Sequence, residues 1–108
     1  MRRRAFGRAA TGLLGLVLVA GLAGAQDAPS PEAIKAGAHT YASNCSPCHG
    51  ARMQDPEGAF DLKTFPRGQR DRFFRSVRNG KNAMPPWGGV LSTEEIEGLW
   101  AYVSSGGG

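Results

Sequence analysis

Cys45-Ser46-Pro47-Cys48-His49 is the stretch that decides the fold of this 108-residue chain. Its two cysteines are about one helical turn apart if the segment is helical, and the histidine directly follows the second cysteine. This C-x-x-C-H pattern is typical of covalent haem attachment, in which two thiols add to the haem vinyl groups and the histidine becomes the proximal ligand of the iron. We therefore expect one haem c (iron), held by Cys45 and Cys48 and ligated by His49.

Three other kinds of site could use the same residues. A thioredoxin-like redox pair needs a βαβ context, which this sequence does not predict. A zinc site would need His39 as its fourth ligand, but the adjacent Cys48 and His49 leave poor room for a closed tetrahedral site. A structural disulfide between Cys45 and Cys48 is chemically possible in an oxidising compartment, but it would close a very small loop and constrain little of the chain.

The composition also favours a cofactor. The chain has 16 glycines and 7 prolines, but only 2 cysteines. Such a chain forms few regular elements and buries a small core, so something else must stabilise it. A single disulfide over so short a span would contribute little, whereas a covalently bound haem would supply a large apolar surface for the core.

The N-terminal residues 1–25 have the layout of a secretory signal peptide. Four arginines lie among the first eight residues, and an uncharged segment over residues 9–25 ends in Ala23-Gly24-Ala25, a small-residue cleavage site. Cleavage after Ala25 removes four of the 13 basic residues, so the pI of 9.6 does not indicate a nucleic-acid partner. The segment could instead remain as a membrane anchor, at the short end of the spanning range. In both cases the remainder is exported, and we expect a periplasmic location.

The rest of the chain predicts an all-α domain over residues 31–105, preceded by a flexible leader (26–30) and followed by a disordered tail (106–108). Helices are expected over residues 31–44 and 68–78, and a third begins at the capping box Ser92-Thr93-Glu94-Glu95 and continues to about residue 103. No stretch predicts a strand. The residues expected to face inward are Ile34, Gly37, Ala38 and Tyr41 on the first helix, Phe73, Phe74 and Val77 on the second, and Ile96, Leu99, Trp100 and Val103 on the third.

An iron ligated by His49 needs a sixth ligand or keeps an open site. Met84 is the best candidate, because the prolines that follow it at positions 85 and 86 fix the backbone beside its sulfur. Met53 lies only four residues beyond His49, which is too little chain to reach over the haem. His39 is expected on the surface of the first helix. The alternative for Met84 is an ordinary core methionine.

With these residues in place, residues 31–104 resemble the small single-haem class I cytochromes c. The resemblance rests on Gly37-x-x-x-Tyr41, on the segment from Arg78 to Trp87, and on Leu99-Trp100-Ala101-Tyr102-Val103. It implies three main helices wrapped around one haem, with Trp87 packed against it. Family members commonly have Gly-Pro-x-Leu after the haem motif, whereas this chain has Ala59-Phe60-Asp61-Leu62, so the acceptor for the His49 imidazole is expected at a backbone carbonyl near Phe60.

His/Met ligation would fill both axial positions and leave no site for substrate, so the resemblance implies a one-electron carrier and not an enzyme. Redox protein partners follow from this function: a donor dehydrogenase, and an oxidase or another cytochrome as acceptor. The segment from Phe60 to Phe65 is similar to short cytochromes that serve periplasmic quinoprotein alcohol dehydrogenases. We expect a monomer. The alternatives are a haem subunit of a larger complex, or a haem enzyme or gas sensor if Met84 is not a firm ligand.

The charge pattern suggests how a partner would dock. Seven cations lie between residues 63 and 81, with one anion among them: Lys63, Arg67, Arg70, Arg72, Arg75, Arg78 and Lys81, with Asp71. Glu94, Glu95 and Glu97 lie together elsewhere, and the resulting dipole could steer the protein toward an acidic partner. The alternatives are that the arginines only solvate a helix face, or that one or two pair with haem propionates.

Overall fold

A computed structural model describes residues 28–107, so the predicted signal peptide, residues 26 and 27 of the predicted leader and the terminal Gly108 lie outside the described residues. The described part contains the helices α1 (Pro31–Asn44), α2 (Ser46–His49), α3 (Arg70–Asn79) and α4 (Thr93–Ser104), and the 3-10 turns η2 (Ala51–Met53) and η3 (Leu62–Thr64). Extended pairing within residues 28–107 is limited to one bridge between Lys81 and Met84. The predicted all-α class is confirmed.

The ends of the long helices follow from their capping residues. The Ser30 hydroxyl accepts the Ala33 N–H at 3.1 Å, ahead of the proline that begins α1. At the start of α4, Ser92 and Glu95 exchange hydrogen bonds of 2.9 and 3.0 Å, which is the predicted capping box. Helix α3 begins two residues later than predicted, because the Gln69 N–H bonds to the Pro66 carbonyl and closes a turn first.

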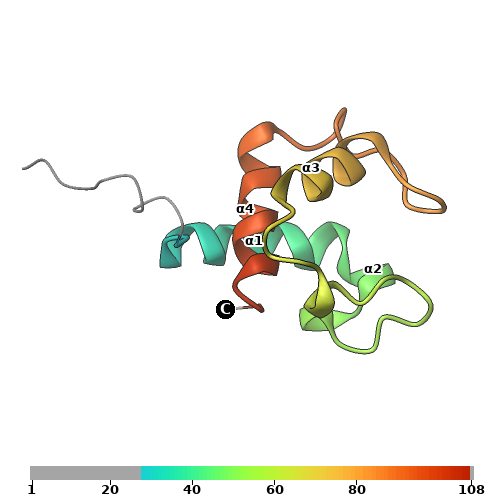
Figure 1. The fold of residues 1–108 in the computed structure, drawn as a ribbon, viewed down its shortest axis with the longest axis horizontal. Helices are drawn as coiled ribbons and strands as arrows, with labels where there is room; N and C mark the ends of the chain where they lie inside the picture. The colour runs from blue at the N-terminus through green and yellow to red at the C-terminus, as the bar shows by residue number, and fades with distance from the viewer. Residues whose placement is uncertain (1–27, 108) are drawn as a thin grey trace, which may run out of the picture.

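Helices α1 and α4 cross in direct contact (Figure 1). The crossing point is at Gly37 and Gly98: a Cβ on Gly37 would lie 1.8 Å from the Gly98 carbonyl oxygen. Gly37 therefore faces inward, as predicted. The matching glycine on α4 was not predicted, and it lets the two backbones touch with no side chain between them.

The core lies where α3 and the loops pack against this crossing. Its fully buried side chains are Tyr41, Met53, Ile96 and Leu99. Phe73, Phe74 and Val77 are buried as predicted, while Ile34, Ala38 and Trp100 are only partly buried. Phe65, Phe73 and Trp100 form a cluster of mutually tilted or edge-on rings with centroids 5.1–5.9 Å apart. None of the helices in residues 28–107 combines the length and apolarity that crossing a bilayer requires.

Candidate functional site

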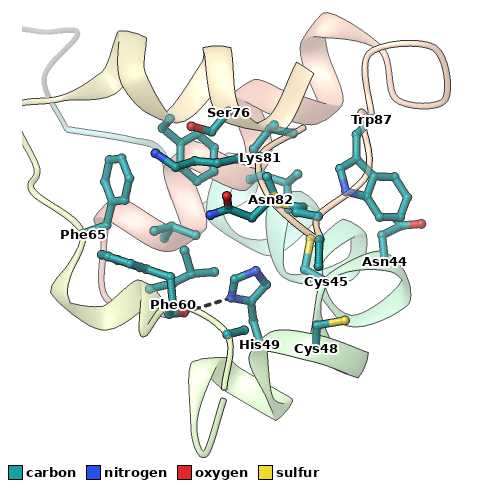
Figure 2. Close-up of a pocket in the computed structure, with 18 of the residues that line it drawn as sticks. Asn44, Cys45, Cys48, His49, Phe60, Phe65, Ser76, Lys81, Asn82 and Trp87 are labelled. Atoms are coloured by element: carbon teal, nitrogen blue, oxygen red, sulfur yellow. Dashed lines mark hydrogen bonds between the residues drawn. The ribbon is translucent and has the colours of Figure 1, made fainter. Parts of the chain in front are cut away.

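A cavity of about 680 Å³ lies between α2, α3, α4 and the loops that connect them (Figure 2). Most of its lining surface is apolar, although charged side chains such as Glu57, Arg72 and Lys81 also reach it. The side chains that the sequence singled out lie on these walls: Cys45, Cys48, His49, Met84 and Trp87. The fold thus brings together residues that are up to 42 positions apart in the sequence.

His49 ends the short helix α2, and its ring points away from that helix into the cavity (Figure 2). Its Nδ1 atom is 3.0 Å from the carbonyl oxygen of Phe60. A carbonyl can only accept a hydrogen bond, so Nδ1 must carry the proton, and Nε2 keeps its lone pair free for a metal. The acceptor expected near Phe60 is therefore the Phe60 carbonyl itself.

The two cysteines lie one turn apart, as the motif requires. The His49 N–H bonds to the Cys45 carbonyl at 2.9 Å, so the motif is helical. Both cysteines are free thiols, and burial, helped by the neighbouring Cys48, raises the pKa of Cys45 to about 11. A thiol with so high a pKa is almost entirely neutral at pH 7, which does not suit a thiol–disulfide redox pair.

The alternative sites gain no support from the described residues. No group of three or more His, Cys, Asp or Glu side chains within residues 28–107 is arranged to hold a metal ion by itself. His39 is exposed on α1 and does not line the cavity. Met53 does not line it either, because its side chain is fully buried in the core. Met84 is therefore the only methionine of residues 28–107 on the cavity wall.

Met84 belongs to a tight turn that is closed by two backbone hydrogen bonds. The Lys81 N–H bonds to the Met84 carbonyl at 3.0 Å, and the Met84 N–H bonds back to the Lys81 carbonyl at 2.9 Å. Asn82, inside the turn, has a φ of 55°, a left-handed conformation that asparagine tolerates better than most residues. The Trp87 N–H then bonds to the Val77 carbonyl at 2.8 Å and ties the segment to α3.

Several cavity residues were not predicted as part of the site. Phe65 and Asn82 line the cavity (Figure 2), and so does Arg72, whose guanidinium lies 4.9 Å from the centre of the Phe65 ring. Arg72 also donates a 2.8 Å hydrogen bond to Gln69. The sequence places Phe65 only at the end of the segment similar to other short cytochromes, and Arg72 among the basic residues 63–81, for which pairing with haem propionates is one alternative; no spacing rule connects either residue to the haem motif.

Comparisons with known proteins agree with this geometry. Residues 32–103 match the family model described as "Cytochrome C oxidase, cbb3-type, subunit III". Cytochrome c6 of Bryopsis maxima is 35% identical over 82 residues, which cover 65% of this chain and 88% of that protein. Cytochrome c6 of a Synechococcus species is 38% identical over 72 residues, covering 62% of this chain and 64% of that protein.

A solved structure is similar as well. Cytochrome c6 from the diatom Phaeodactylum tricornutum superposes with a TM-score of 0.54 at 34% sequence identity, covering 67% of this chain and 91% of that one. This neighbour has the class I cytochrome fold, which confirms the fold expected from the sequence.

The cavity suits the cofactor of these relatives. Members of the family bind one covalently attached haem c. The apolar walls would exclude water from a flat macrocycle, and two thiols, an imidazole and a thioether on the same walls match the chemistry of c-type attachment and ligation. The chain belongs to the cytochrome c family as a small single-haem class I cytochrome c, an electron-transfer protein and not an enzyme.

Proposed function

We propose that Cys45 and Cys48 bind the haem through two thioether bonds and that His49 and Met84 are the axial ligands of its iron. The observation that carries this proposal is that all four side chains line one cavity. When bound, the haem supplies a one-electron couple between Fe(II) and Fe(III). Trp87, which is partly buried and also lines the cavity, would pack against the macrocycle.

The protein residues set the properties of this couple. The hydrogen bond from His49 Nδ1 to the Phe60 carbonyl orients the imidazole and makes it a stronger electron donor. The Met84 thioether favours reduced iron and raises the potential. With His49 and Met84 both holding the iron, no coordination site would remain for a substrate, and only an electron would be exchanged with a partner.

A first experiment tests the covalent attachment of the haem and the ligation of its iron by Met84. We expect haem to stay with the polypeptide after acid extraction in the wild type, and to be released when both cysteines are replaced by alanine. Reduced wild-type protein should not bind carbon monoxide rapidly, whereas Met84→Ala should. Rapid binding to the wild type would mean that Met84 is not a firm ligand and would favour a haem enzyme or gas sensor.

We further propose that the mature chain (residues 26–108) is a periplasmic shuttle. It would take an electron from a dehydrogenase, of which a quinoprotein alcohol dehydrogenase is the leading candidate, and pass it to a terminal oxidase or another cytochrome. The signal-like layout of residues 1–25 supports export, and the matching family model, whose description names an oxidase subunit, supports an oxidase as acceptor. Cell fractionation with N-terminal sequencing tests both the location and the cleavage after Ala25.

The docking surface for these partners is proposed on the basic segment from Lys63 to Lys81. Three of its arginines already have partners: Arg70 pairs with Glu97 at 3.1 Å, Arg72 bonds to Gln69, and Arg78 bonds to Thr93. Within residues 28–107 the other four cations form no ion pair or side-chain hydrogen bond: Lys63, Arg67, Arg75 and Lys81. These four are the side chains best able to meet an acidic partner.

Charge reversal tests this surface. Arg75→Glu should slow reduction by the donor several-fold at low ionic strength and hardly at all at high salt, because salt screens the steering. Lys35→Glu makes the same charge change on the exposed face of α1 and serves as the control. Equal rates and equal salt dependence for the two variants would overturn the proposed surface.

A further inference from the structure

The Phe60 carbonyl is the one described protein group that bonds to the His49 ring, so the orientation of that carbonyl controls the imidazole. Its oxygen is 3.0 Å from Nδ1. The Phe60 carbonyl and the Asp61 N–H belong to one planar peptide unit, which turns as a whole. Whatever fixes the backbone on either side of this peptide therefore fixes the acceptor for His49.

The Phe60 side of the peptide is weakly anchored. The Phe60 side chain is 49% exposed, and its ring meets that of Phe65 edge-on at 6.0 Å. The Phe60 N–H makes no hydrogen bond to another backbone group or side chain within residues 28–107. A proline at position 60 would have fixed φ near −65°, but this chain has none there.

The Asp61 side is held by three hydrogen bonds. The Asp61 carboxylate accepts the Lys63 N–H at 3.0 Å and so caps η3. The Asp61 carbonyl accepts both the Thr64 N–H at 3.0 Å and the Thr64 hydroxyl at 2.8 Å. These bonds close a turn around Asp61 from both its side chain and its backbone, so the peptide that begins at the Phe60 carbonyl has little freedom to rotate.

We propose that Asp61 is a positioning residue for His49: the turn that it caps aims the Phe60 carbonyl at Nδ1, and thereby takes over the restraint that a proline would provide. This inference rests on the proposed role of His49 as the axial ligand. Asp61 touches neither the haem cavity nor the ring itself. It acts through the peptide bond that it shares with Phe60.

The test compares three variants of the haem-loaded protein by NMR in the reduced state and by redox titration. Asp61→Ala removes the cap, and we expect exchange of the His49 Nδ1 proton with solvent to become about tenfold faster, the order of one lost hydrogen bond. The midpoint potential should rise, since a less firmly bonded imidazole donates less to Fe(III). Asp61→Asn keeps an acceptor oxygen, so its Nδ1 proton exchange rate and its midpoint potential should equal those of the wild type. Lys63→Ala, which leaves its N–H in place, is the matched control.

A second pair of variants keeps the proposal falsifiable if Asp61→Ala fails to fold. Thr64→Val removes only the hydrogen bond from the Thr64 hydroxyl. Its proton exchange rate and midpoint potential should change in the same direction as in Asp61→Ala, but by less. Phe60→Pro should bring the values of Thr64→Val and Asp61→Ala back toward the wild type, because the proline restores the missing restraint. Wild-type exchange and potential in both Asp61→Ala and Thr64→Val would overturn the proposal, as would an Asp61→Asn variant as impaired as Asp61→Ala.

The same experiment separates this inference from the proposed ligation. If His49 is the ligand, its ring protons show strong paramagnetic shifts in the oxidised wild type. Absence of those shifts would overturn the ligand assignment itself. Their presence, with exchange that is insensitive to Asp61 and Thr64, would overturn only the positioning role.

Discussion

Two walls of the cavity present the two proposed ligands, and they are held by different means. The Met84 wall, residues 80–88, is fixed by backbone bonds alone: Lys81 and Met84 bond to each other twice, and Trp87 bonds to α3. The His49 wall, residues 45–60, also has backbone bonds, such as that from the His49 N–H to the Cys45 carbonyl, but side chains add to them: the Tyr41 hydroxyl bonds to the Gly50 carbonyl at 2.6 Å, and the His49 ring bonds to the Phe60 carbonyl. Substitutions that change the backbone conformation should therefore have the larger effect on the Met84 wall. Loss of a single side-chain hydrogen bond should have a smaller effect on the His49 wall.

The largest effect is expected at Gly80 on the Met84 wall. Gly80 has a φ of 81°, and a Cβ there would lie 2.8 Å from the Met84 carbonyl oxygen and 2.9 Å from the Pro86 nitrogen. Gly80→Ala should lower the free energy of unfolding by about 2 kcal/mol and weaken Met84 ligation. Denaturant titration measures the free energy of unfolding, and the sulfur-to-iron charge-transfer band in the near-infrared spectrum reports the Met84 ligation. Gly89→Ala, where a Cβ would meet nothing within 4 Å, is the control, and equal stability of the two variants would contradict the account.

A smaller effect is expected at Tyr41, which supports the His49 wall. Tyr41→Phe removes the hydrogen bond to Gly50 and leaves the half-buried Gly50 carbonyl with the Met53 N–H as its remaining partner, so we expect a loss of about 1 kcal/mol in urea unfolding. Met84 ligation should be unchanged, since no backbone shape is altered. Tyr102→Phe is the matched control, because the Tyr102 hydroxyl makes no hydrogen bond within residues 28–107. A Tyr41→Phe variant as stable as the wild type would show that the bond does not support the wall.

The same tyrosine predicts a change of stability with pH. Burial raises the pKa of Tyr41 from 10.0 to about 12. Between these values the unfolded chain has released the proton and the folded chain still holds it, so the stability contributed below pH 10 is lost as pH rises toward 12. Unfolding curves collected from pH 9 to about pH 12 should be less steeply pH-dependent in Tyr41→Phe than in the wild type. Identical slopes would argue against a buried, protonated Tyr41.

The smallest effect is expected at Pro85, beside the ligand on the Met84 wall. Pro85→Ala keeps both backbone bonds between Lys81 and Met84 but gives the unfolded chain more freedom, which should lower stability by about 0.5 kcal/mol. Thermal unfolding of the haem-loaded protein measures this change. A loss as large as that of Gly80→Ala would mean that the proline, and not the backbone bonds, holds the wall.

The Met84 wall could be predicted from the sequence much better than the His49 wall. Asn79-Gly80 and the two prolines are local signals whose conformational effects do not depend on the rest of the fold, so the helix end and the stiff loop followed directly from them. The three long helices were predictable for the same reason, because their caps and apolar spacing are local.

Beyond the C-x-x-C-H motif at residues 45–49, the His49 wall has no such local signals. Three residues of types that rarely favour a positive φ have one here, so only the surrounding structure can impose it: Arg52, Met53 and Glu57. Met53 belongs to the short turn η2, and its complete burial brings it near residues far along the chain: a Cβ on Gly107 would lie 3.3 Å from the Met53 Cε. The lining roles of Phe65 and Arg72 are likewise products of the tertiary fold.

Ligation of the iron by His49 and Met84 can be checked through the weak sulfur-to-iron charge-transfer band of the oxidised protein in the near infrared. Met84→Leu and Met53→Leu remove one sulfur each at similar side-chain volume, the first from the cavity wall and the second from the core. The band should be present in the wild type, unchanged in Met53→Leu and lost in Met84→Leu. A band that survives in Met84→Leu, or is absent from the wild type, would contradict this ligation.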